Sequence, residues 1–210
     1  MPPTAPSALA ENGLPPPRPF WRDPAFGVAA ALFLLAGKVT LVSAWGGVHI
    51  AVLVRDPAAH FGFPPYAGLI SHAGIALLTA TAACALMAAL LGAPHRRALL
   101  AAGMLSAVLA VDDLFLLHEI APRLIEAGIF AVYGALALVI ALLLRRERAG
   151  MPLTGLKVAV AFLGVSVVAD VFKVYGPFAY WLEDFSKLSG FGAWAAFWIG
   201  LAAKGLRPAA

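Results

Sequence analysis

Six apolar stretches divide this chain, and they restrict its fold more than any other feature of the sequence. Each is about 20 residues or longer, the length that an α-helix needs to cross roughly 30 Å of hydrocarbon at about 1.5 Å per residue. Charged residues make up 12% of the chain, about half of their share in a soluble domain. We therefore predict an all-α fold, a polytopic membrane protein built as a six-transmembrane-helix bundle. The predicted spans are residues 26–49, 68–91, 98–120, 124–144, 156–175 and 180–203.

The two ends of the chain fall outside these spans. Residues 1–25 are rich in proline and alanine and contain no apolar core, so we predict a disordered cytoplasmic tail. Residues 26–204 form the predicted transmembrane domain, and residues 205–210 form a short cytoplasmic tail. Cys84 is the single cysteine, which excludes an intrachain disulfide and a cysteine-rich metal site.

Basic residues mark one side of the predicted bundle. Ten of the fifteen lysines and arginines lie in the tails or in the loops of that side, whereas only Arg55 and Arg123 lie in loops of the other side. Because loops rich in Lys and Arg stay in the cytoplasm, both termini are predicted to be cytoplasmic, with the protein in the inner (plasma) membrane. This distribution also explains the net charge of +4 without a nucleic-acid partner. Membrane lipid is the expected partner, together with a second copy of the chain or another subunit of a membrane complex.

Carboxylates concentrate in the outer half of the predicted spans. A carboxylate in hydrocarbon costs several kcal/mol unless it is paired, protonated, metal-bound or facing water. The sequence therefore predicts an intramembrane polar site toward the outer face. Six of the eleven acidic residues contribute to it, namely Asp112, Asp113, Glu119, Asp170, Glu183 and Asp184.

The third span carries the densest group of polar residues. Helical geometry places Asp112 and Glu119 on one face, with Asp113 about 100° around the axis. Adjacent like charges repel in a low dielectric, so the two aspartates need a cation or a proton. His118 points away from this face on a straight helix and joins the site only if the helix unwinds near Pro122. The alternative interpretation is a polar knot that locks the helices together.

The fifth and sixth spans each offer a pair of opposite charges. Asp170 and Lys173 are three residues apart, and Glu183 and Lys187 are four apart with the acid first, so each pair can interact along its own helix. Asp184 lies near the start of its helix, where an acid offsets the helix macrodipole.

Acids outnumber the lysines available to neutralise them. If all three lysines in the spans pair with an acid, three acids remain for water, protons or a metal ion. Histidines and carboxylates together form a ligand set for zinc, manganese or iron, and carboxylates alone suit calcium. The spacing matches neither HExxH nor the Glu-x-x-His pair of di-iron bundles. The three lysines are Lys38, Lys173 and Lys187.

The first functional hypothesis is a metal-dependent membrane hydrolase that acts on a lipid or another amphiphile. The metal would lower the pKa of a bound water to about 7, and Glu183 would act as the general base with Asp113 as a second catalytic carboxylate. The predicted metal ligands are Asp112, Asp113, Glu119, Asp170, His72 and His118. The remaining residues of the predicted polar site are Ser71, Lys38, Lys173, Asp184 and Lys187.

Two other classes of function fit the same residues. A proton- or cation-coupled transporter or channel would use the carboxylates as a relay. However, the ionisable groups concentrate in the outer half, which favours a pocket that opens to one side. A non-catalytic subunit of a membrane complex would pair its acids across an interface with a partner.

Overall fold

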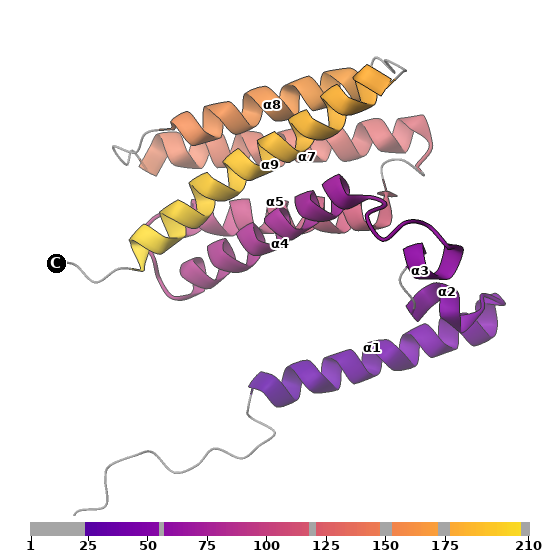
Figure 1. Ribbon diagram of the computed structural model, residues 1–210. Helices are drawn as coiled ribbons and strands as arrows, with labels where there is room; N and C mark the ends of the chain where they lie inside the picture. The colour runs from indigo at the N-terminus through magenta and orange to yellow at the C-terminus, as the bar shows by residue number, and fades with distance from the viewer. Residues whose placement is uncertain (1–23, 55–56, 118–120, 148–152, 172–176, 207–210) are drawn as a thin grey trace, which may run out of the picture. The chain divides into compact units, whose positions relative to one another are not determined.

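The computed structural model describes residues 24–54, 57–117, 121–147, 153–171 and 177–206. Every secondary-structure element in this part of the chain is an α-helix, which confirms the predicted all-α fold for the described residues. The helices fall into two compact units along the chain (Figure 1), residues 1–67 and residues 68–210.

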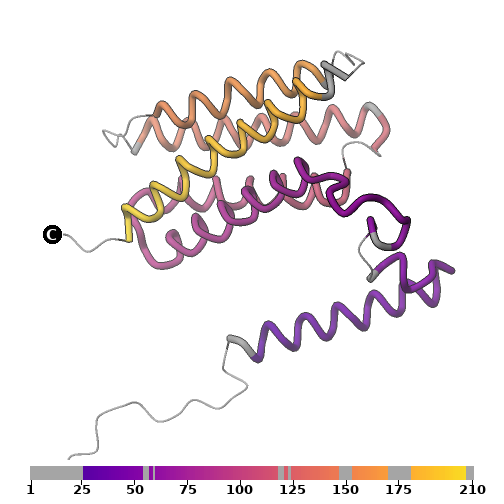
Figure 2. The backbone as a smooth tube through the Cα atoms, in the orientation of Figure 1, coloured from indigo at the N-terminus to yellow at the C-terminus, as the bar shows by residue number. Residues whose placement is uncertain are grey.

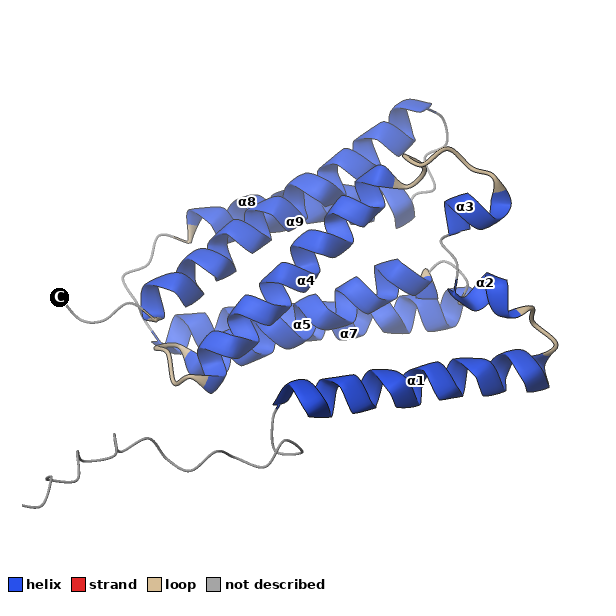
Figure 3. Cartoon of the chain, turned by 60° about the horizontal axis from the view of Figure 1, so that its bottom comes forward, coloured by secondary structure: helices blue, strands red, loops and turns tan. Residues whose placement is uncertain are grey.

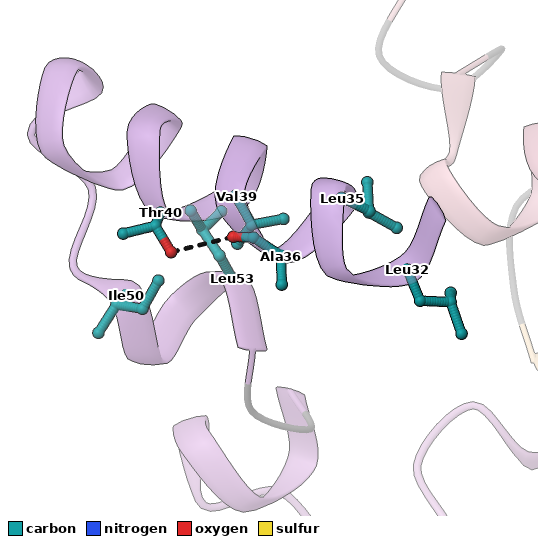
Figure 4. A pocket seen from close by; sticks show the side chains of 7 residues that line it. All are labelled: Leu32, Leu35, Ala36, Val39, Thr40, Ile50 and Leu53. Carbon is teal, nitrogen blue, oxygen red and sulfur yellow. Dashed lines mark hydrogen bonds between the residues drawn. The ribbon is translucent and has the colours of Figure 1, made fainter. Parts of the chain in front are cut away.

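The first unit contains one long helix and two short ones. α1 covers Pro24–Gly46, and α2 (Ile50–Val54) and α3 (Pro57–Phe61) follow it between the first two predicted spans. α1 and α2 enclose an apolar groove of about 350 Å³ (Figure 4). The Thr40 hydroxyl in this groove donates to the Ala36 carbonyl at 2.9 Å, so its own helix already satisfies it. The groove is lined by Leu32, Leu35, Ala36, Val39, Thr40, Ile50 and Leu53.

The second unit is a bundle of five long helices, which the backbone tube of Figure 2 and the turned view of Figure 3 both show side by side. α4 packs against α5 and α9, α8 packs against α9, and α7 packs against α5. α4 and α9 end close together, since a Cβ at Gly205 would lie 3.0 Å from the Ala93 Cβ. The five helices are α4 (Leu69–Leu90), α5 (Arg96–Phe115), α7 (Arg123–Glu147), α8 (Thr154–Val171) and α9 (Pro177–Gly205).

Four helices in the described residues are long and apolar enough to cross a membrane: Phe26–Gly46, Leu69–Leu90, Arg96–Phe115 and Leu124–Arg146. α8 contains a shorter apolar helix, and α9 is 29 residues long but carries three charged residues in its first half. Large apolar side chains are exposed on several of these helices, with Phe33 81%, Leu124 87% and Val160 60% accessible. Soluble monomers rarely expose so much apolar surface, and these faces fit contact with lipid.

One helix ends before the end of its predicted span. The third span was expected to run as one helix to residue 120, but α5 ends at Phe115 and Leu116 adopts a left-handed conformation with φ 52° and ψ 38°. The Leu116 amide donates to the Asp112 carbonyl and caps the helix. A left-handed turn costs a non-glycine residue about 1–2 kcal/mol, so leucine gives no local signal for a helix end.

Buried and half-buried residues recur every seven positions where α4, α5 and α9 meet, and we call this interface the central seam. Seven-residue spacing keeps one face of each helix toward its neighbours. The central seam is apolar except at a few positions, and its ionisable pair lies at one end. Its members at this spacing are Ser71, Leu78 and Ala85 on α4, Leu99, Ser106 and Asp113 on α5, and Lys187, Trp194 and Leu201 on α9.

A buried hydrogen-bond chain crosses the middle of the central seam. The Trp194 indole N–H donates to the Ser106 hydroxyl at 2.9 Å, and this hydroxyl donates to the Ala102 carbonyl at 2.8 Å. Trp194 is 6% exposed and Ser106 is fully buried. Because both residues are buried, the Trp194 N–H depends on the Ser106 hydroxyl for its hydrogen bond.

Ser106→Ala is expected to lower the free energy of unfolding by about 1–3 kcal/mol, because the buried Trp194 N–H loses its acceptor. Thermal unfolding of the purified protein in detergent, followed by circular dichroism, measures the change. Ser189→Ala is the matched control, since Ser189 is exposed on α9. Equal stability of the two variants would contradict a contribution from this hydrogen bond.

Candidate functional site

Three helices bring their polar residues together at one end of the central seam. The Lys187 ammonium of α9 forms an ion pair and a hydrogen bond with Oδ1 of Asp113 on α5. The Ser71 hydroxyl of α4 donates to Oδ2 of the same carboxylate at 3.3 Å. Both oxygens of Asp113 are therefore engaged, and we call this group the Asp113 cluster.

The two charges of the pair differ in their access to solvent. The Asp113 side chain is 4% exposed, whereas that of Lys187 is 28% exposed. Removing a carboxylate from water costs several kcal/mol unless a cation and hydrogen-bond donors replace the water. Lys187 and Ser71 supply both, which explains how a buried carboxylate is tolerated here. Lys187 is the more exposed of the two charged groups, so a ligand would reach the pair from its side.

A second carboxylate lies beside the first and faces a different helix. Asp112 is 4% exposed and interacts with Tyr133 of α7 through a side-chain hydrogen bond. The two adjacent aspartates are about 100° apart on α5, so one faces α4 and α9 while the other faces α7. Sequence reasoning missed Tyr133, although it is the one tyrosine of the predicted span 124–144.

An aromatic ring closes the inner side of the Asp113 cluster. A Cβ at Gly74 would lie 3.1 Å from Cδ2 of Phe191 and 3.9 Å from Oδ2 of Asp113. Phe191 is one turn of α9 beyond Lys187, and Gly74 is one turn of α4 beyond Ser71. The ring therefore lies against the glycine, next to the carboxylate. Neither residue was among the predicted site residues.

The other predicted site residues differ in their exposure, and some of them lie outside the described residues. His72 is exposed, and its ring lies 3.6 Å from the position of a Cβ at Gly68, whereas its neighbour Ser71 faces Asp113. Lys38 is exposed on α1 in the first unit. On α9, Glu183 is half-buried and Asp184 is exposed. His118, Glu119, Lys173 and the side chain of Asp170 lie outside the described residues.

The donor set for a metal is incomplete in the described part of the chain. No group of three His, Cys, Asp or Glu side chains lies close enough there to hold one ion. Asp112 and Asp113 supply carboxylates, but Lys187 already neutralises Asp113. In chemical terms, the Asp113 cluster offers a carboxylate base, a hydroxyl and an ammonium within one partly accessible site.

Comparison with known proteins places most of this chain in one family. No curated protein and no solved structure matches it. Residues 25–201, which include the whole Asp113 cluster and all of α1 except its first residue, match the family described as Domain of unknown function (DUF8692). The chain therefore belongs to the DUF8692 family.

Proposed function

We propose that this protein is a multi-pass membrane hydrolase that takes the polar head of a lipid or amphiphile at the Asp113 cluster. The buried Asp113 carboxylate, held between Lys187 and Ser71 from two other helices, carries this proposal. Replacing a buried ion pair by apolar residues is often neutral or stabilising, so stability alone is a weak reason to keep one. Ionisable groups inside a membrane domain are most often functional.

The proposed topology has six spans, with both termini in the cytoplasm and the Asp113 cluster toward the outer face. Basic residues support this orientation, because Arg96 and Lys204 lie at the end of the bundle opposite Asp113. Arg145 and Arg146 occupy the last turn of α7, which runs away from the cluster. When Lys and Arg concentrate at one end of a set of spans, that end usually lies in the cytoplasm.

The proposed chemistry is the hydrolysis of an ester. Asp113 takes a proton from water while the water oxygen bonds to the ester carbonyl carbon, and the Lys187 ammonium faces the developing oxyanion. The ester C–O bond then breaks, and the proton passes to the leaving alkoxide. Glu183, four residues before Lys187 on α9, is the proposed second carboxylate. A metal-dependent mechanism of this hydrolysis needs metal ligands in addition to Asp112 and Asp113.

Asp113→Asn is expected to lower the rate of ester hydrolysis by about 10²–10⁴-fold, the range for loss of a general base. The measurement uses the full chain in detergent with p-nitrophenyl esters of several chain lengths and with phospholipid micelles. Asp184→Asn is the control, since Asp184 is exposed on the same helix as Lys187. A folded wild-type protein that hydrolyses none of these amphiphiles would count against the proposal.

Elemental analysis by mass spectrometry tests the metal-dependent version. Wild type and Asp113→Asn are compared after supplementation with zinc, manganese, iron and calcium. Near-stoichiometric metal that the variant loses supports a metal at the cluster. If the protein hydrolyses esters without bound metal, the metal-dependent mechanism is wrong and Asp113 acts as the base without a metal.

A structural lock is the second candidate role, and full pairing of Asp113 favours it. In that case the cluster joins α4, α5 and α9, and the chain serves as a non-catalytic subunit of a membrane complex. A path for ions through the bundle is less well supported, because Phe191, Leu78 and Trp194 fill the central seam beyond the cluster. Loss of stability in the Asp113 variants, without hydrolysis in the wild type, would favour the lock.

A further inference from the structure

On its inner side, the Asp113 cluster is followed directly by buried apolar residues of α9 and α4. Along α9, Lys187, Phe191 and Trp194 follow one another on one face at i, i+4 and i+7. Phe191 is 5% exposed, Trp194 is 6% exposed, and Leu78 of α4 is 1% exposed. The environment therefore changes from charged to apolar within about two helical turns.

Gly74 allows Phe191 to approach α4 closely. A Cβ at this position would lie 3.1 Å from Cδ2 and 3.4 Å from Cε2 of the ring, tighter than ordinary van der Waals contact. The ring therefore rests on the backbone of α4 without an intervening side chain. The same missing side chain leaves Asp113 Oδ2 free of an apolar neighbour on that side, since the Cβ would lie 3.9 Å from it.

We propose that Phe191, packed on Gly74, forms a floor beneath the Asp113–Lys187 pair and restricts the ligand of the site to a small polar head group. The partly exposed Lys187 is the entrance, and the ligand's apolar part stays outside the bundle. Exposed apolar faces such as those of Phe162 and Val165 on α8 offer a surface for it. The head-group part of this inference rests on the proposed function, whereas the floor itself is measurable without a substrate.

Tryptophan fluorescence reports on the floor, because Trp194 and Trp198 lie beyond it. Trp198 is fully buried in the hydrophobic core. Replacing Trp21, Trp45 and Trp181 with phenylalanine leaves these two as the only tryptophans of the chain. Acrylamide, a small neutral quencher, then measures how far a solute of head-group size penetrates from the cluster.

Phe191→Ala in this background is expected to raise the acrylamide quenching constant several-fold, because removing the ring connects the cluster with Trp194. Phe191→Val, a milder change, is expected to raise it less. Phe185→Ala is the matched control: Phe185 is exposed on α9 and stacks on Trp181 in the unmodified chain. Cooperative thermal unfolding in detergent shows whether each variant is folded. If Phe191→Ala does not fold, the quenching constant of Phe191→Val tests the proposal.

Two outcomes would overturn the floor. One is strong quenching of Trp194 and Trp198 while Phe191 is still present. The other is unchanged quenching in every folded Phe191 variant. Absence of ester hydrolysis in the wild type would refute the proposed function but not the floor, since the quenching experiment needs no turnover.

Discussion

Lys187→Met is expected to lower the free energy of unfolding by about 3–5 kcal/mol, the range for removing one partner of a buried ion pair. The loss is large because the Asp113 carboxylate, whose side chain is 4% exposed, is left buried without its cation. In the Lys187→Met variant, the Ser71 hydroxyl is the one donor of the cluster that still bonds to the Asp113 carboxylate. Thermal unfolding in detergent, followed by circular dichroism, measures the change.

Asp113→Leu is expected to destabilise the protein less than Lys187→Met. The Lys187 side chain is 28% exposed, so its ammonium can turn toward water or lipid head groups after its partner is removed. The Ser71 hydroxyl loses an acceptor at the same time, but it carries no charge. The order of the two single variants therefore tests which charge is the more deeply buried.

The double variant Asp113→Leu/Lys187→Met is expected to recover most of the stability lost in the single variants, because apolar residues of similar volume replace a buried pair at little net cost. A double-mutant cycle gives the coupling free energy of the pair. If the losses of the two single variants simply add in the double variant, the ion pair does not act as a unit. A stable double variant without hydrolysis would assign the pair to function rather than to folding.

Helical periodicity accounts for what could be predicted about the site. Asp112 and Asp113 were placed on an inward-facing arc of the third span, and both are buried in the structure. Ser71 and Lys187 were included as polar residues, but no spacing rule connects them with Asp113. The partner of Lys187 lies 74 residues away in the chain, whereas the sequence offered Glu183 one turn away on the same helix.

The parts of the site that escaped prediction depend on packing between helices. In the sequence, Phe191 does not differ from the other apolar residues of its long apolar span. Gly74 is one of 20 glycines. Their contact becomes visible only once α4 and α9 lie side by side. The helix end at Leu116 was also not predicted, since no propensity distinguishes this residue from the leucines around it. The all-α class and four of the long apolar helices, in contrast, follow from length and composition alone.

Gly103→Ala and Gly190→Ala are each expected to lower the free energy of unfolding by about 1–3 kcal/mol, the usual cost of overpacking a close contact. A Cβ at Gly103 on α5 would lie 2.7 Å from Cγ and 3.2 Å from the backbone nitrogen of Leu86 on α4. A Cβ at Gly190 on α9 would lie 2.6 Å from Cγ and 3.1 Å from the backbone nitrogen of Leu163 on α8. In both cases backbone has to move, so a rotamer change alone does not relieve the contact.

Two other helical glycines provide the matched controls for this prediction. Gly164 on α8 and Gly134 on α7 have nothing within 4 Å of an added Cβ, so alanine there is expected to raise stability by about 0.5–1 kcal/mol through helix propensity. The double variant Gly103→Ala/Gly190→Ala is expected to lose the sum of the two single losses, because the contacts lie between different helix pairs. Thermal unfolding in detergent gives all five values. If alanine at the two contact glycines is tolerated as well as at the control positions, small residues are not what brings these helices together.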